Sequence, residues 1–132
     1  MSADKLQHPA RTPDISVRVV EFDHAYPNEY SHFVYQIQQT DTFVRWLTDL
    51  RDMRAKARIL TRLEAARLGN LGDTRSVGDR VREMRVDVGP GYRVYFTRRQ
   101  RIVVVLLCGG DKSTRNRDIA RAKQIVAQLN ED

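Results

Sequence analysis

Ligands for a metal site are scarce in this chain of 132 residues. It has a single cysteine, Cys108, and its three histidines all lie within the first 33 residues. Zinc sites are built from clusters of cysteine and histidine, and the carboxylates show no pattern suited to a two-metal centre. No metal or other cofactor is therefore expected. Cys108 lies in an apolar run, where a cysteine of a reducing compartment behaves as a small core residue rather than as a nucleophile.

Long apolar runs are also missing. The longest, Ile102–Cys108, is far shorter than the roughly 20 residues of a membrane span. The N-terminal residues 1–14 lack the apolar centre of a signal peptide. We therefore expect a cytoplasmic protein without a membrane partner.

Proline and charge divide the chain in two. Residues 1–33 hold three of the four prolines, with three Lys/Arg against five Asp/Glu, a net charge of −2. Residues 34–132 hold 20 Lys/Arg against 12 Asp/Glu, a net charge of +8. Residues 1–33 are predicted to be an irregular or flexible extension, in which only Ile15–Phe22 could form a strand, paired with the body loosely or not at all. Residues 34–132 are predicted to form one domain.

Periodicity predicts an α+β domain on an antiparallel sheet. A strand at Val34–Thr40 is followed by a helix capped by Asp41 or Thr42, a second helix at 54–68, and loops around Gly72 and Gly78. Three strands follow between Val81 and Lys112, with turns at 89–91 and 99–100, and a last helix is capped by Ser113 or Thr114. The helix residues expected in the core are Phe43, Trp46, Leu47, Leu50, Ala55, Ile59, Leu63, Ala66, Ile119, Ala122, Val126 and Leu129.

Side chains alternate along the first two of these three strands. Met84, Val86, Val88, Val94 and Phe96 share an apolar face, and the opposite, solvated face carries Glu83, Arg85, Asp87, Arg93 and Tyr95. On that face Arg85 and Arg93 could clamp one phosphate and stabilise a pentacoordinate transition state. Tyr95 or Glu83 could transfer a proton, or Tyr95 could stack on a base. The alternative is a lattice of Arg–Glu ion pairs on an exposed surface.

The sequence Gly109-Gly110-Asp111-Lys112-Ser113-Thr114 lies where a strand gives way to a helix. This segment has the features of a general anion-binding site. Its glycines permit close approach of the backbone, the helix amides point outward, and Lys112 stands at the entrance. The spacing is not that of a Walker loop. The alternative is an ordinary turn in which Asp111 and Ser113 are capping residues.

Arginine supplies 19 of the 23 basic residues, which favours bidentate phosphate or carboxylate contacts. Arg54, Arg58 and Arg62 form a stripe at i, i+4 and i+8, and a second row on the last helix holds Arg115, Arg117, Arg121 and Lys123. Together with Arg82, these residues are predicted to follow an RNA backbone. They could equally meet an acidic partner or form a solvated helix face.

The blocks that carry a family resemblance run from about Val34 to Leu129. They are Phe43-x-x-Trp46-Leu47-x-x-Leu50, Ala55-x-Ala57-Arg58-Ile59, Gly69-Asn70-Leu71-Gly72-Asp73, Val77-Gly78, Glu83-Met84-Arg85, Gly89-Pro90-Gly91-Tyr92-Arg93-Val94-Tyr95-Phe96 and Leu107-Cys108-Gly109-Gly110-Asp111-Lys112-Ser113-Thr114. In this order they resemble the phage-derived addiction-module killer proteins, a HigB-like branch of the RelE/ParE superfamily of toxins.

The resemblance implies a RelE-like microbial RNase fold, with two N-terminal helices and a C-terminal helix on an antiparallel sheet. It implies a type II toxin that cuts mRNA, commonly on the ribosome, by attack of a ribose 2′-hydroxyl and without a metal. The family's functional positions fall on Arg93, Arg85 and Lys112. The family's C-terminal catalytic tyrosine has no counterpart here, because residues 113–132 contain neither Tyr nor His; Tyr95 is the candidate to replace it.

The resemblance also implies partners: mRNA, the ribosome and a cognate antitoxin, typically a helix-turn-helix protein whose acidic segment would occupy the basic face. The acidic extension 1–33 is not part of the family pattern and could lie over the same groove. Members like ParE inhibit gyrase without cutting RNA. The alternative is therefore a non-catalytic protein of this fold that inhibits a protein target such as gyrase, or an inactive member that binds its antitoxin.

Overall fold

The computed structural model describes residues 17–19 and 35–129 of the chain. Its elements follow in the order β1 (Val17–Val19), β2 (Gln36–Thr40), α2 (Asp41–Asp49), α3 (Met53–Arg67), β3 (Thr74–Gly78), β4 (Val81–Val86), β5 (Tyr92–Arg99), β6 (Val103–Asp111), the 3₁₀ turn η2 (Lys112–Thr114) and α4 (Arg115–Leu129). Of the helices described, none combines the length and apolarity that a membrane crossing requires. The α+β class is confirmed.

The strands form one mixed sheet in the order β1-β2-β6-β5-β4-β3. Neighbours pair antiparallel except β2 and β6, which run parallel, so the prediction of a purely antiparallel sheet is wrong. The α2–α3 excursion and the β3–β4–β5 meander separate β2 from β6 in the sequence, and alternation within a strand carries no information on the direction of such a distant partner.

The structure differs from the sequence-based predictions at two strands. β3 lies where the sequence predicted only short loops around Gly72 and Gly78, and it forms the sheet edge beside β4. Within the extension, Val17–Val19 pairs antiparallel with β2 and so joins the other edge. The rest of the predicted extension, residues 1–16 and 20–33, lies outside the described residues, as does the idea that it covers the basic groove.

Helix starts are set by side-chain caps. Thr40, rather than Asp41 or Thr42, caps α2: its hydroxyl accepts from the Phe43 amide at 3.1 Å and donates to the Leu107 carbonyl at 2.7 Å, which ties β2 to β6. Asp52 caps α3, with its carboxylate 3.0 Å from the Ala55 amide. Gly69, at φ 100°, provides the left-handed stop that was predicted for α3.

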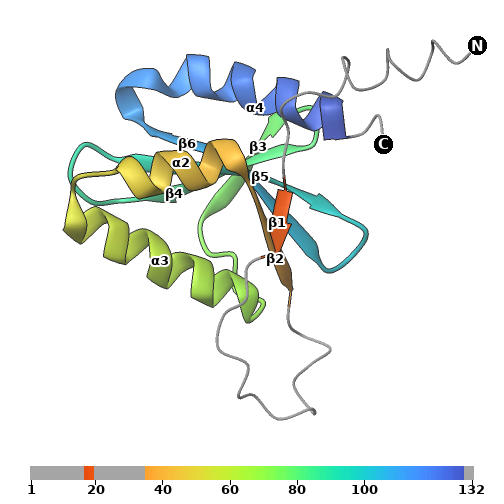
Figure 1. Cartoon of the computed structure of the whole chain (residues 1–132), viewed down its shortest axis with the longest axis horizontal. Helices are drawn as coiled ribbons and strands as arrows, with labels where there is room; N and C mark the ends of the chain where they lie inside the picture. The colour runs from red at the N-terminus through yellow and green to blue at the C-terminus, as the bar shows by residue number, and fades with distance from the viewer. Residues whose placement is uncertain (1–16, 20–34, 130–132) are drawn as a thin grey trace, which may run out of the picture.

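Helices cover both faces of the sheet (Figure 1). α2 and α3 pack on the face formed by Met84, Val86, Val94, Phe96, Val104 and Leu106. α4 packs on the other, against Val81, Tyr95, Val103, Val105 and Leu107. The apolar helix residues predicted for the core are all buried or partly buried. The face predicted to be solvated is therefore partly a second core.

Candidate functional site: a cationic cavity at the start of α4

A cavity of about 430 Å³ opens where the first residues of β5 meet η2 and α4. Its lining is Arg93, Lys112, Ser113, Thr114, Arg115, Asn116 and Arg117. Four of these seven side chains are cationic, the others are a hydroxyl pair and an amide, and none is a carboxylate. A lining of this kind suits an anion such as a phosphate or a carboxylate.

Local capping shapes the wall of the cavity. The Asp111 carboxylate accepts from the Ser113 amide at 2.8 Å and begins η2. The hydrogen bond from the Ser113 side chain is the main reason why the pKa of Asp111 lies below its usual value; amide hydrogen bonds from Ser113 and Thr114 add to it, and partial burial opposes it. The acidic side chain of this segment is thereby committed to its own turn, as the capping alternative predicted, while Lys112 remains exposed beside the cavity.

Behind the cavity, Glu83 is fully buried and surrounded by guanidinium groups. Arg115 Nε donates to Glu83 Oε2 at 2.8 Å, Arg93 Nε lies 3.4 Å from the same oxygen, and Arg75 Nε lies 3.5 Å from Oε1. The side chains of Arg93 and Arg115 are 9% and 29% exposed, whereas that of Arg75 is 60% exposed. One carboxylate thus holds two of the three arginines that line the cavity, and more positive charge gathers there than Glu83 neutralises.

Tyr95 belongs to the same buried cluster. Its hydroxyl donates to Glu83 Oε2 at 3.1 Å, and its side chain is fully buried. Desolvation, and then the charge of Glu83, raises the pKa of Tyr95 well above its usual range. The prediction that Glu83 and Tyr95 lie on a solvated face is wrong, because α4 covers them. Neither lines the cavity, so the structure gives neither a direct path to a substrate proton.

Arg85 and Arg93, which alternation predicted to share a face, are register partners on adjacent strands. Arg85 is nevertheless exposed and outside the cavity lining, whereas Arg93 turns inward, with its Nη1 donating to the Gly91 carbonyl at 3.1 Å. The predicted Arg85–Arg93 clamp is therefore replaced: the cationic neighbours of Arg93 in the cavity are Lys112, Arg115 and Arg117.

The two glycines before Lys112 serve packing rather than anion approach. A Cβ on Gly109 would lie 2.5 Å from the Trp46 ring, and a Cβ on Gly110 would meet the Asp118 carboxylate and the Thr114 hydroxyl. Asp118 is buried and accepts a hydrogen bond from Thr114. The absence of side chains lets α2 and α4 approach β6 from opposite sides, so this part of the anion-loop interpretation is wrong.

The predicted RNA-binding arginines do not form one track. Arg115 lines the cavity, but Arg54 and Arg58 are exposed on α3, which covers the opposite face of the sheet. Arg62 donates to the Arg85 carbonyl at 2.6 Å and to the Leu71 carbonyl at 3.4 Å, so it holds the loop before β3. Arg82 donates to the Thr74 hydroxyl at 3.2 Å and links β4 to β3.

Sequence reasoning missed several contributors. Arg75 reaches Glu83 from β3, a short strand that lies between two glycines in the sequence. Only the weak alternation of Thr74-Arg75-Ser76 could have indicated this strand. Asn116 joins the lining because the first turn of α4 faces the cavity, whereas Arg117, which also lines it, belongs to the basic row that the sequence predicted on the last helix. In the parts described, no group of three or more His, Cys, Asp or Glu side chains could hold a metal.

Comparison with known proteins gives one informative relative. An uncharacterized protein of Haemophilus influenzae is 48% identical over 94 residues, which cover 71% of this chain and 95% of the relative. No protein-family model matches the chain, and no solved structure is significantly similar to it. The length of the match indicates that the relative consists almost entirely of the segment it shares with this chain.

Proposed function

We propose that this chain, which belongs to the same family as the Haemophilus influenzae protein, is the toxin of a type II toxin–antitoxin system and cleaves mRNA as a metal-independent endoribonuclease. The observation that carries the proposal is the cationic cavity lined by Arg93, Lys112, Arg115 and Arg117. The RelE-like assignment of the fold belongs to the same proposal. It is supported by the sequence blocks described above and by helices packed on a sheet with β6 and β5 at its centre.

The chemistry fits transfer of an RNA phosphoryl group. The ribose O2′ attacks the adjacent phosphorus, the P–O5′ bond breaks, and the products are a 2′,3′-cyclic phosphate and a 5′-hydroxyl. Charge on the equatorial phosphate oxygens rises in the transition state. Guanidinium and ammonium groups already fixed around that position stabilise it without reorganisation. Arg93 and Lys112 are assigned to the scissile phosphate, with Arg115 beside them.

Glu83 and Tyr95 are assigned as positioning residues. Glu83 holds Arg93 and Arg115 in place, and Tyr95 holds Glu83. Because no lining residue is a carboxylate or a phenol, the proton of the 2′-hydroxyl passes to water, and water returns a proton to O5′. A cavity of about 430 Å³ has room for a phosphate and several waters, each of which occupies about 30 Å³ in the liquid.

The same cavity is a docking point for a carboxylate. An antitoxin with an acidic segment would neutralise it by placing Asp or Glu side chains among Lys112, Arg115 and Arg117. We include such an antitoxin, of helix-turn-helix type, in the proposal, together with action on the ribosome in the cytoplasm.

The test uses exposed and inner cavity residues separately. Lys112→Ala removes an exposed side chain and is expected to leave the fold intact while lowering cleavage at least tenfold. Arg93→Ala is expected to abolish growth arrest. Arg45→Ala is the control, since Arg45 is exposed on α2 and outside the cavity. Growth after induction is scored together with mapped transcript ends, and codon-phased cuts that vanish in both cavity variants support the nuclease.

One observation favours the second candidate, a non-catalytic toxin-fold protein that inhibits a target such as gyrase or only binds its antitoxin. Glu83 and Tyr95 are engaged in an internal hydrogen-bonded cluster, and the lining of the cavity contains neither a carboxylate nor a histidine that could act as general base. Intact messages with DNA damage after induction would select the gyrase inhibitor. Intact messages with normal growth would select the antitoxin-binding member.

A further inference from the structure

The turn between β5 and β6 is a second concentration of positive charge. We call residues 98–101 the hairpin tip; they are Arg98, Arg99, Gln100 and Arg101. Arg98 and Arg101 are exposed and Arg99 is half-buried. No carboxylate pairs with any of these arginines in the part of the chain that the structure describes. Among the described residues, these three guanidinium groups therefore have no acidic partner.

The hairpin tip is braced from within. Arg98 places its guanidinium 4.9 Å from the centre of the Tyr35 ring, and its Nη2 donates to the Tyr35 hydroxyl at 2.9 Å and to the Arg101 carbonyl at 3.2 Å. The Ile102 carbonyl accepts from the Gln36 amide of β2 at 2.6 Å. Arg98 thus fixes the turn, so Arg99 and Arg101 project from a backbone whose ordering entropy is already lost.

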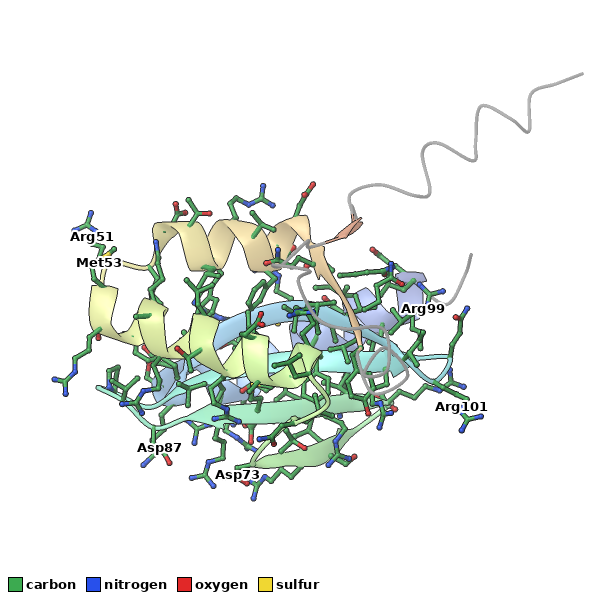
Figure 2. All side chains as sticks on the ribbon, turned by 90° about the horizontal axis from the view of Figure 1, so that it is seen from below. Arg51, Met53, Asp73, Asp87, Arg99 and Arg101 are labelled. Carbon is green, nitrogen blue, oxygen red and sulfur yellow. The ribbon has the colours of Figure 1, made fainter. Side chains whose placement is uncertain are left out.

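The hairpin tip and the cavity lie at opposite ends of β5. Arg93 is near the start of the strand and Arg99 is its last residue. At about 3.3 Å per residue, the eight residues of β5 span roughly 23 Å. Figure 2 shows Arg99 and Arg101 at one end of the molecule, with Arg51, Met53 and Asp87 at the other. A nucleotide bound in the cavity does not reach the hairpin tip.

We propose that the hairpin tip is a second RNA contact, which binds the sugar–phosphate backbone of a double-stranded RNA segment through Arg99 and Arg101. This inference rests on the proposed function in that RNA is the substrate. Guanidinium groups on a narrow, protruding β-ribbon suit phosphates along a groove. Protein interfaces are centred on apolar and aromatic side chains, and among the residues that the structure describes Ile102 is the one large exposed hydrophobic residue adjoining the hairpin tip. The chemistry therefore favours RNA over an acidic protein.

The experiment measures the salt dependence of binding by the full chain to a 16-base-pair duplex of 2′-O-methyl RNA, which lacks the attacking hydroxyl. Arg99→Gln with Arg101→Gln is expected to reduce the magnitude of the slope of log K against log [salt] by about two, one for each phosphate contact. The matched control, Arg45→Gln with Arg51→Gln, removes the same charge from exposed positions elsewhere and is expected to change the slope much less.

The two proposals fail separately. Lys112→Ala is expected to lose cleavage of a single-stranded RNA, while its salt dependence of duplex binding equals that of the Arg45→Gln, Arg51→Gln control. The variant with Arg99→Gln and Arg101→Gln is expected to cleave a short single-stranded RNA normally. A duplex slope in the hairpin variant equal to that of the control overturns this inference, whatever the cavity does. Unchanged duplex binding with lost antitoxin binding also overturns it and makes the hairpin tip a protein surface.

Discussion

The two faces of the sheet differ in what their helices cover. Under α2 and α3 the buried sheet side chains are apolar, from Met84 on β4 to Leu106 on β6. Under α4 the apolar part, which includes Val105 and Leu107, adjoins a buried ionic cluster centred on Glu83. An apolar face gains stability from any close packing, whereas a buried carboxylate is tolerated only with fixed cationic partners. The second face therefore fixes Arg93 and Arg115, two of the arginines that line the cavity.

The largest expected effect comes from removing the centre of that cluster. Glu83→Ala leaves Arg93 and Arg115 without their carboxylate and is expected to lower the free energy of unfolding by about 3–5 kcal/mol in urea titration. Growth arrest should be lost as well. Leu106→Ala is the matched change on the apolar face, with an expected cost of about 2–5 kcal/mol.

The two variants are expected to differ in their effect on the cavity. Leu106→Ala should keep RNA cleavage at a temperature where it remains folded, whereas Glu83→Ala should not. If the free energy of unfolding of Glu83→Ala equals that of the wild type, the Glu83 cluster does not stabilise this face of the sheet. If both variants lose cleavage equally while folded, the two faces are not functionally distinct.

A smaller effect is expected for Tyr95→Phe. The hydrogen bond to Glu83 Oε2 is lost, while Arg115 still donates to that oxygen, so the expected cost is about 1–2 kcal/mol. As a positioning residue, Tyr95 should leave growth arrest and the pattern of transcript ends nearly unchanged. Loss of cleavage in a variant with a normal urea transition would instead make the phenol a proton carrier, as the family resemblance suggested.

The smallest effect concerns the cap at the cavity wall. Asp111→Ala removes the carboxylate that accepts from the Ser113 amide and is expected to cost about 1 kcal/mol at pH 7. Because the pKa of Asp111 is lowered in the folded state, its contribution is present above the unfolded pKa and disappears as pH falls through the folded value. The stability difference between wild type and variant should therefore shrink below about pH 4. A difference that is constant down to pH 2 would contradict the cap.

Sequence periodicity predicted the helices and most strands because each element carries its own apolar face. Ala55, Ile59 and Leu63 recur at helical spacing, and Val94 and Phe96 alternate along a strand. β3 was missed because its residues are half-exposed at a sheet edge and lack that signal. The parallel pairing of β2 and β6 was missed because no local pattern encodes it.

For the candidate site, the sequence identified Arg93, Lys112 and Arg115 but not their grouping. Alternation placed Glu83, Arg85, Arg93 and Tyr95 on one face, and the strand register agrees. What alternation could not supply was the helix above them. Burial by α4 turned Glu83 and Tyr95 into supports and left Arg85 outside the cavity.

The sequence by itself determined the order and type of most elements, the apolar stripe of each helix, and the gathering of Arg, Tyr and Glu on one strand face. These depend on contacts between residues a few positions apart. Only the tertiary structure decided which polar groups meet a solvent-filled cavity and which are buried, because that depends on where α4 packs against strands that precede it by up to 40 or so residues. Whether a charged side chain on a strand lines the cavity or is buried therefore depends on the helix that packs over that strand.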